Sequence, residues 1–416
     1  MIKKPRGTKD LLPNEAKIWV YLENKYREVC RRFNYGEIRT PMFESTSLFH
    51  RGVGETTDIV QKEMYSVVTN RGKDEITLKP EGTAPVVRAF IENKLYADTQ
   101  PSKYFYITDA FRHERPQAGR LRHFHQFGIE AFGSAEPTMD AEVIQLADMF
   151  LRELGIENLE LHINSIGCKE CRSNYNKVLR EYLKDYLEDL CETCNDRFEK
   201  NPMRILDCKT DADKEAIKNA PRILDHICDE CKDHFEAVKE YLGLMGIEYK
   251  VDPNIVRGLD YYNRTAFEFI SGDIGAQSTV CGGGRYDGLV EDIGGPSTPG
   301  VGFGMGIERL VMVLEELNLL PEVDNGIEVY FVAMGENALK KSVELSTKLK
   351  KSNIQCEINH MAKSAKAQFK YANKVNARYS IVIGDDEIEK GIVNIKNMET
   401  GDQVEKSMDD LVEFFK

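Results

Sequence analysis

The sequence lacks the features that would place it in a membrane or outside the cell. No apolar run in its 416 residues approaches the length of about 18 residues that a membrane-spanning helix needs. The basic N-terminus MIKKPRGTKDLLPNE has no apolar segment behind it, so no signal peptide is indicated. A cytoplasmic protein without a membrane partner is therefore expected. Ten cysteines in such a chain favour reduced thiols or metal ligands over a disulfide framework.

Two common nucleotide-binding motifs are also missing. The absence of G-x-x-x-x-G-K-[ST] argues against a P-loop NTPase. The glycines of CGGGRYDGL, residues 281–289, lack the G-x-G-x-x-G spacing that leads into a helix in dinucleotide-binding folds. A nucleotide would therefore be bound by side-chain cations on a sheet. Arginine suits this task because its planar guanidinium binds phosphate oxygens in bidentate fashion.

Composition and charge are those of a large globular protein. Hydrophobic residues make up 41% of the chain and charged residues 30%. At roughly 150 residues per domain, the length predicts about two to three domains. The net charge of -13 argues against non-specific wrapping of nucleic acid, but it is compatible with a local basic patch.

Hydrophobic patterning divides the chain into three parts. Residues 14–35 predict a long amphipathic helix, and strands then alternate with helices to residue 164 and again over 251–320. This pattern indicates an α+β domain with a largely antiparallel sheet. Strand signals vanish over 165–250, which is typical of a helical insertion. Residues 319–326 predict a linker, and strand–helix alternation over 326–416 predicts a small α/β domain.

Residues 111–133, FRHERPQAGRLRHFHQFGIEAFG, predict a hairpin with a basic tip. Alternation along its second strand sends Gln126, Gly128 and Glu130 to one face. Gln126 and Glu130 would then flank a gap at Gly128, which suits a small polar ligand lying on the sheet. A solvent-exposed polar face is the alternative.

The same hairpin resembles motif 2 of the class II aminoacyl-tRNA synthetases, and specifically that of the histidyl-tRNA synthetase family. Three further segments agree with this resemblance: IRTPMFE (38–44) is similar to motif 1, GVGFGMGIERL (300–310) to motif 3, and VRGLDYY (256–262) to the histidine-specific segment. LKPEGTAPVVRAF (78–90) is also similar, although Lys79 stands where arginine is expected in many relatives. Lysine keeps the charge but not the bidentate geometry.

The resemblance implies a class II antiparallel-sheet catalytic domain over 1–164 and 251–320, with a helical insertion at 165–250. It also implies an α/β anticodon-binding domain over 326–416. The chain would form a homodimer, because motif 1 with Pro41 belongs to the dimer interface in this class. In the last domain, Lys363, Lys366, Lys370 and Lys374 share a helix face. This face would either contact tRNA phosphates or be solvated.

The implied activity is ATP-dependent ligation of L-histidine to tRNA(His) through a histidyl-adenylate, with release of AMP and diphosphate and with Mg²⁺ accompanying ATP. The implied catalytic residues are Arg112, Arg257 and Arg309. The implied histidine-binding residues are Glu81, Gly82, Thr83, Arg112, Gln126, Glu130, Arg257, Tyr261 and Tyr262. The implied ATP-binding residues are Arg112, Glu114 and Arg309, and the implied tRNA-binding residues are Arg115, Gln117, Arg120 and Arg122.

An alternative from the same resemblance is a non-catalytic, histidine-sensing regulatory subunit of ATP phosphoribosyltransferase. Such paralogues typically lack the C-terminal domain and degrade the ATP and histidine segments. Arg112, Arg257, Arg309 and residues 326–416 are all present here, which favours the ligase.

Seven cysteines lie in or at the edge of the insertion, six of them as C-x-x-C pairs: Cys168/Cys171, Cys191/Cys194 and Cys228/Cys231, with Cys208 between the last two pairs. Two such pairs can complete a tetrahedral zinc site. One hypothesis is a structural zinc ion at Cys191, Cys194, Cys228 and Cys231. The alternative is reduced, partly buried thiols.

Overall fold

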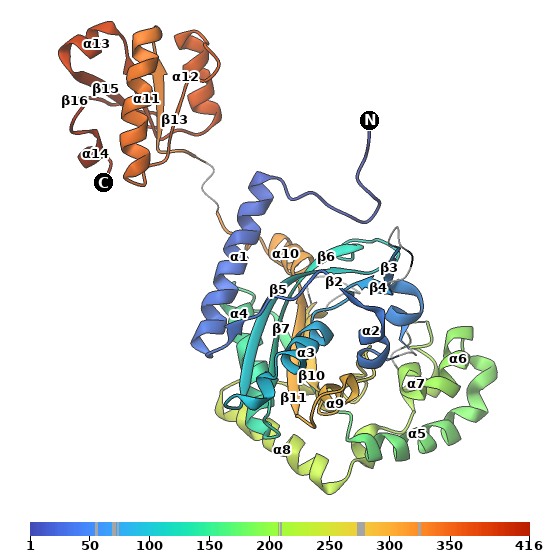
Figure 1. Cartoon of the computed structure of the whole chain (residues 1–416). Helices are drawn as coiled ribbons and strands as arrows, with labels where there is room; N and C mark the ends of the chain where they lie inside the picture. The colour runs from blue at the N-terminus through green and yellow to red at the C-terminus, as the bar shows by residue number, and fades with distance from the viewer. Residues whose placement is uncertain are drawn as a thin grey trace. The chain divides into compact units, whose positions relative to one another are not determined.

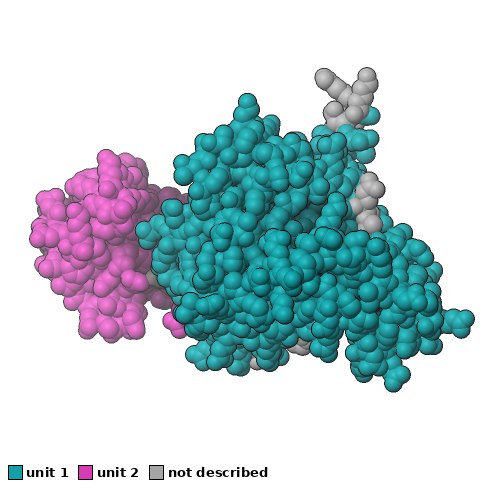
Figure 2. All heavy atoms as spheres, turned by 90° about the horizontal axis from the view of Figure 1, so that it is seen from below, with its two compact units in different colours: residues 1–321 teal, residues 322–416 magenta. Residues whose placement is uncertain are grey.

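The computed structural model describes residues 1–54, 57–68, 72, 75–206, 208, 210–272, 279–322 and 326–416. These residues form two compact units, 1–321 and 322–416, which Figure 2 shows in different colours. Part of the predicted linker, residues 323–325, lies outside the described residues. In the described parts of the chain, no helix is long and apolar enough to cross a membrane.

A large sheet forms the centre of the first unit (Figure 1). Its eight strands lie in the order β1 (Gly36–Glu37), β5 (Ser102–Phe111), β6 (His123–Phe132), β11 (Gly300–Gly306), β10 (Thr279–Arg285), β9 (Asn263–Ser271), β7 (Leu159–Ser165) and β8 (Lys250–Val251). The outermost pairs, β1–β5 and β7–β8, are parallel, and the neighbours between them are antiparallel. The prediction of a largely antiparallel sheet is confirmed.

Long helices cover one face of this sheet and form its main core: α1 (Pro13–Arg32), α4 (Pro137–Glu153), α8 (Asp229–Leu244) and α10 (Ile307–Glu316). The alternation predicted for β6 is confirmed, because Phe127 and Ile129 are fully buried under these helices. The ring of Tyr26 from α1 stacks on Phe127 with centroids 4.4 Å apart. Such aromatic contacts strengthen a core beyond the area they bury.

Smaller elements cover the other face. They are a three-stranded sheet of β2 (Phe43–Ser45), β4 (Ile76–Leu78) and β3 (Tyr65–Val67), the helices α2 (Thr46–Gly52), α3 (Thr83–Glu92) and α9 (Leu289–Ile293), and the short turns Ile59–Glu63 and Leu95–Ala97. Arg88 of α3 pairs with the buried Glu44 of β2 at 2.5 Å. This ion pair ties the motif 1 segment to the helix that follows Glu81.

A helical segment connects β7 to β9. It contains α5 (Lys169–Leu183), α6 (Glu192–Lys200), α7 (Glu215–Lys218) and α8, with 3-10 turns at Lys184–Asp189, Pro202–Ile205 and Ile223–His226. The described residues between β7 and β8 include no strand. The last helix differs from the expectation of a separate module, because Phe235, Val238 and Leu242 of α8 join the main core beside α4.

The second unit has a five-stranded sheet in the order β13 (Cys356–Ile358), β12 (Val329–Ala333), β14 (Tyr379–Ile383), β15 (Ile392–Asn397) and β16 (Gln403–Ser407). Its helices are α11 (Glu336–Lys351), α12 (Ala365–Lys374), α13 (Asp385–Lys390) and α14 (Leu411–Phe414). The first three strands are parallel, as the strand–helix alternation predicts. The antiparallel strands β15 and β16 extend this sheet beyond the predicted alternation.

Candidate active site

A polar cavity of about 220 Å³ opens on the face of the large sheet opposite the long helices. Eight predicted site residues line it: Glu81, Thr83, Arg112, Gln126, Arg257, Tyr261, Tyr262 and Arg309. Glycines of β10 and β11 form part of its floor, including Gly282 and Gly304. The segments that carry these residues are far apart in the sequence, and the sheet brings them together.

Three arginines give the cavity a strong positive charge. Arg112 follows β5 and donates from Nε to the carbonyl oxygen of Pro80 at 2.8 Å. Arg309 lies in the first turn of α10 and donates to the carbonyl oxygen of Thr279 at 2.7 Å. Burial, followed by the positive charge of Arg120, lowers the pKa of Arg309. The guanidinium still stays charged, so an anionic ligand would relieve this repulsion.

Arg257 is held flat against the sheet. Its guanidinium pairs with Glu268 of β9 and lies 5.4 Å from the centroid of the Tyr262 ring. A Cβ atom at Gly282 would come within 2.7 Å of the guanidinium nitrogens. Glycine at this position therefore lets the arginine lie on β10.

Acceptor groups face the arginines across the cavity. The Glu81 carboxylate accepts the backbone N–H groups of Thr83 at 2.9 Å and Ala84 at 2.8 Å, which caps the start of α3. Burial raises the pKa of Glu81. The Oε1 atom of Gln126 is buried and lacks a hydrogen-bond partner in the described part of the chain. A bound ligand with N–H donors would satisfy this oxygen.

Glu130 lies behind the cavity wall rather than on it. It is 1% exposed, and its carboxylate accepts hydrogen bonds from the hydroxyls of Tyr106, at 3.1 Å, and Tyr286. Burial raises the pKa of Glu130 to about 8. A Cβ atom at Gly302 would lie 2.1 Å from a Glu130 oxygen, so this motif 3 glycine makes room for the carboxyl.

The predicted gap at Gly128 is filled by a side chain, and that prediction is wrong. Tyr106 lies directly opposite Gly128 in the β5–β6 pair, and its ring covers the glycine. A Cβ atom at Gly128 or at Gly82 would come within 2.2 Å of this ring. Gly82 thus shapes the site by admitting Tyr106, and it does not line the cavity itself.

Two tyrosines of the site, Tyr106 and Tyr286, are not among the residues predicted from the sequence. Tyr106 lines the cavity, and Tyr286 packs edge-on against Tyr261 with centroids 5.6 Å apart. A glycine paired with an aromatic residue across a hairpin is a recognisable signal, so the β5–β6 register would have identified Tyr106. No comparable local signal exists for Tyr286, because it follows β10 and meets Glu130 only through the fold.

Comparisons with known proteins identify the family. A model described as histidyl-tRNA synthetase matches residues 7–310, and an anticodon-binding-domain model matches 328–416. The chain belongs to the histidyl-tRNA synthetase family. A histidine–tRNA ligase of Clostridioides difficile is 56% identical over 100% of this chain and 99% of its own length. A histidine–tRNA ligase of Alkaliphilus oremlandii is 56% identical over 98% of this chain and 96% of its own length.

The same family accounts for the fold. The crystal structure of apo Staphylococcus aureus histidyl-tRNA synthetase superposes with a TM-score of 0.86 at 40% identity, covering all of both chains. The family resemblance and the class II fold expected from the motifs are therefore confirmed.

The motif 2 loop of this synthetase divides the predicted tRNA-binding residues into two pairs. Arg115 and Gln117 are exposed. Arg120 lies 3.5 Å from the carboxylate of Glu114, and Arg122 donates to the backbone carbonyl of Glu114 at 3.1 Å. Arg120 and Arg122 thus stabilise the loop, and Glu114, predicted to bind ATP, is not among the residues that line the cavity.

Lys79, the departure from the family pattern, is fully buried in this synthetase. Its ammonium group donates to the carbonyl and hydroxyl oxygens of Thr40, both at 3.3 Å. Burial lowers the pKa of Lys79. Because Thr40 lies in motif 1, the lysine links motif 1 to the segment that carries Glu81.

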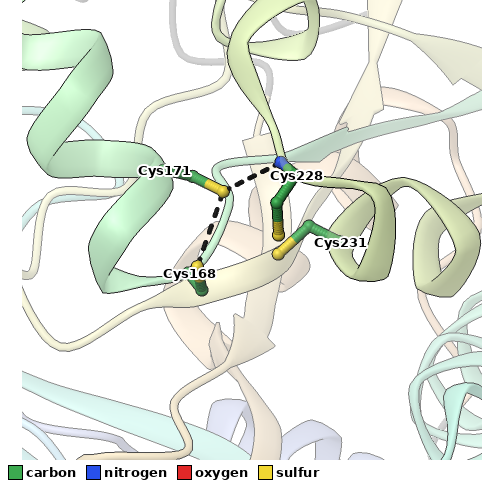
Figure 3. A group of neighbouring side chains, drawn as sticks. All are labelled: Cys168, Cys171, Cys228 and Cys231. Atoms are coloured by element: carbon green, nitrogen blue, oxygen red, sulfur yellow. Dashed lines mark hydrogen bonds between the residues drawn. The ribbon is translucent and has the colours of Figure 1, made fainter.

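The predicted zinc ligands do not form one group, so this prediction is corrected. Among the described residues, two groups bring four ligand atoms within 4.8 Å of one another: Cys168, Cys171, Cys228 and Cys231, and Cys191, Cys194, Cys208 and Asp211. The first group appears in Figure 3. The two predicted pairs separate because α8 returns to the sheet beside α4, whereas α6 stays within the insertion.

Proposed function

We propose that this synthetase ligates L-histidine to tRNA(His) in an ATP-dependent reaction, through a histidyl-adenylate, with release of AMP and diphosphate. The observation that carries the proposal is the cavity itself. It combines three guanidinium groups, which suit phosphates, with a carboxylate and an unpaired amide oxygen, which suit an ammonium group. An amino acid and ATP, taken with its magnesium ion, together present this set of charges.

The first step needs positioning and charge neutralisation. A carboxylate oxygen of histidine forms a bond to the α-phosphorus of ATP while the bond to the bridging oxygen breaks and diphosphate leaves. Arg112 and Arg257 are proposed to neutralise the charge on the α-phosphate, and Arg309 to bind the adenine and terminal phosphates. Such preorganised donors supply much of the rate enhancement in phosphoryl-type chemistry. The terminal ribose of tRNA then attacks the aminoacyl carbonyl, and AMP leaves.

Histidine recognition is proposed to use the acceptor wall. Glu81, Thr83 and Gln126 would bind the α-ammonium group, and Tyr262 one imidazole nitrogen. Glu130 would act on the second imidazole nitrogen through Tyr106. The Tyr106 hydroxyl donates to the Glu130 carboxyl, and Tyr106 lines the cavity. A site that hydrogen-bonds both nitrogens rejects apolar analogues by ~10⁴ or more, because its buried polar groups would be left unpaired.

The tRNA is proposed to meet two surfaces. Arg115 and Gln117, the exposed residues of the motif 2 loop, would contact the acceptor end. The domain at 326–416 would bind the anticodon. The lysines proposed to face its phosphates are all exposed and lie on α12 or just before it: Lys363, Lys366, Lys370 and Lys374.

A homodimer is proposed from the motif 1 segment. Met42 and Phe43 are 40% and 56% exposed, which is unusual for large apolar side chains lying next to each other. The proposed catalytic domain consists of residues 1–164 and 251–320, and the proposed insertion of residues 165–250. Light scattering of the wild type and of Phe43→Asp tests the dimer, and a monomeric wild type would contradict it.

The regulatory-subunit alternative has less support, because the three arginines are assembled in one cavity and the C-terminal domain is present. Histidine-dependent exchange of pyrophosphate into ATP separates the two functions. We expect exchange that requires histidine, followed by charging of tRNA(His). Histidine binding without any exchange would show a sensor.

A further inference from the structure

Four cysteines gather where the insertion leaves the large sheet and returns to it. Cys168 and Cys171 lie at the start of α5, and Cys228 and Cys231 lie at the start of α8. All four Sγ atoms lie within 4.8 Å of one another. Figure 3 shows the four side chains turned toward a common space between the two helix starts. Cys171 and Cys231 are buried, and Cys228 is exposed.

The spacing of the sulfur atoms fits one tetrahedral ion. With a Zn–S bond of about 2.3 Å, the edges of a tetrahedral four-thiolate site measure about 3.8 Å. The Sγ atoms of Cys168 and Cys171 are 3.5 Å apart, and every other pair in the group is within 4.8 Å. A cluster of several iron and sulfide atoms would need more widely spaced ligands. The group is therefore of a size for a single ion.

The local backbone places all four cysteines at the starts of two helices. Cys168 and Cys228 are both N-cap residues with extended backbone, and each has its partner cysteine three residues later in the first helical turn. The positive ends of two helix dipoles thus face the four sulfurs. The backbone N–H of Cys228 also donates to the Cys171 sulfur at 3.1 Å, and this hydrogen bond links the two helix starts directly.

The group is anchored to the catalytic sheet. Gly167, with a φ of +67°, places its backbone so close to Cys171 that a Cβ atom there would lie 2.5 Å from the cysteine Cβ. Arg264, the second residue of β9, donates from its backbone N–H to the Gly167 carbonyl at 2.9 Å, and its own carbonyl accepts the Ile166 N–H at 2.8 Å. An ion bound here would join both ends of the insertion to β9.

We propose that Cys168, Cys171, Cys228 and Cys231 bind one zinc ion as four thiolates and that this ion fixes the base of the insertion to the catalytic sheet. On binding, each thiol that is protonated releases its proton to solvent, and no oxidation takes place. The site is structural, since all four ligand positions are filled by protein. The group of Cys191, Cys194, Cys208 and Asp211 is separate from it.

Metal analysis of the full chain, purified under reducing conditions without chelator, tests the proposal. We expect Cys228→Ser to contain about one zinc ion per chain fewer than the wild type, because serine does not replace a thiolate ligand. Cys228→His should retain the ion, since imidazole is also a zinc ligand. Cys356→Ser, a buried cysteine of the second unit, is the matched control and should retain it too. Equal zinc in Cys228→Ser and wild type would overturn the proposal, as would iron in place of zinc.

A second measurement covers the case in which Cys228→Ser does not fold. Cobalt(II) is bound to a Cys191→Ser protein, in which the other cysteine group is incomplete. Absorption bands of tetrahedral cobalt with thiolate charge transfer support the four-cysteine site. An octahedral cobalt spectrum, or a disulfide between any two of these four cysteines in the freshly purified protein, contradicts it.

Discussion

Replacing Glu130 by glutamine removes an ionisable group from a buried part of the proposed histidine site with almost no change in side-chain shape. Burial raises the pKa of this carboxyl from its ordinary 4.5 to about 8, despite hydrogen bonds from Tyr286 and Tyr106. In the empty site near pH 7, the folded protein therefore holds a proton on Glu130 that the unfolded chain has released. Glutamine has no proton to release, so Glu130→Gln should lack this pH dependence.

The sign and size of the effect follow from proton linkage. A group that binds its proton more tightly in the folded state makes stability fall as pH rises from the unfolded pKa to the folded pKa. For Glu130 this window runs from 4.5 to about 8. One pKa unit corresponds to about 1.4 kcal/mol. Between pH 6 and pH 9, the free energy of unfolding of the wild type should therefore fall by about 3 kcal/mol more than that of Glu130→Gln.

The chain contains one tryptophan, Trp19, and it is buried in the main core of the first unit. Urea unfolding followed by its fluorescence thus reports on the unit that holds Glu130. We expect the unfolding midpoints of wild type and Glu130→Gln to diverge as pH rises from 6 to 9, with the variant becoming relatively more stable. Glu157→Gln, at an exposed carboxylate, should follow the wild type. If the unfolding midpoints of wild type and Glu130→Gln changed in parallel from pH 6 to 9, Glu130 would be ionised in the folded protein over this whole range, and the reasoning would be refuted.

Four further predictions concern ligands and packing. In calorimetry, Glu130→Gln should weaken histidine binding far more than ATP binding, because glutamine cannot ionise to form a charge-assisted hydrogen bond when histidine binds; equal weakening would indicate a structural role. Arg257→Ala should lower the rate constant of pyrophosphate exchange by ~10² or more while histidine binding remains detectable, and near-normal exchange would contradict its role. Arg115→Ala should lower tRNA charging by more than it lowers pyrophosphate exchange, and equal losses would indicate a fold defect. Gly302→Ala should destabilise the first unit by about 1–3 kcal/mol, measured by urea unfolding, because its Cβ would clash with Glu130 and with backbone; wild-type stability would show that β11 can shift.

The sequence predicts those parts of the site that depend on local periodicity and on motifs. Alternation along 123–132 places Phe127 and Ile129 in the core and Gln126 on the opposite, cavity-lining face, as the structure shows. Side chains alternate between the faces of a strand whatever lies around it, so one segment suffices for this inference. The position of Arg309 at a helix start follows in the same way from the glycines before it.

Features that depend on contacts between segments could not be predicted from one segment. The space over Gly128 belongs to Tyr106 because β5 and β6 pair in one particular register. A shift of one residue would have turned the Tyr106 side chain to the other face. The hydrogen bond from Tyr286 to Glu130 likewise depends on the order β6–β11–β10 in the sheet, which the motifs do not specify.

Which cysteine pairs come together depends on the topology of the fold and not on their local sequence. All three C-x-x-C pairs start a helix in the same way, with the first cysteine as an N-cap residue, so their local sequence cannot tell which pairs meet. Proximity in sequence alone would join Cys168/Cys171 to Cys191/Cys194, the two pairs with the shortest connection. However, β7 and β9 are antiparallel neighbours that place Ser165 opposite Thr265, so the two ends of the segment between them must come back together. Cys168/Cys171 follow β7 directly, and α8 packs against α4, β7 and β9, which brings Cys228/Cys231 to the same place.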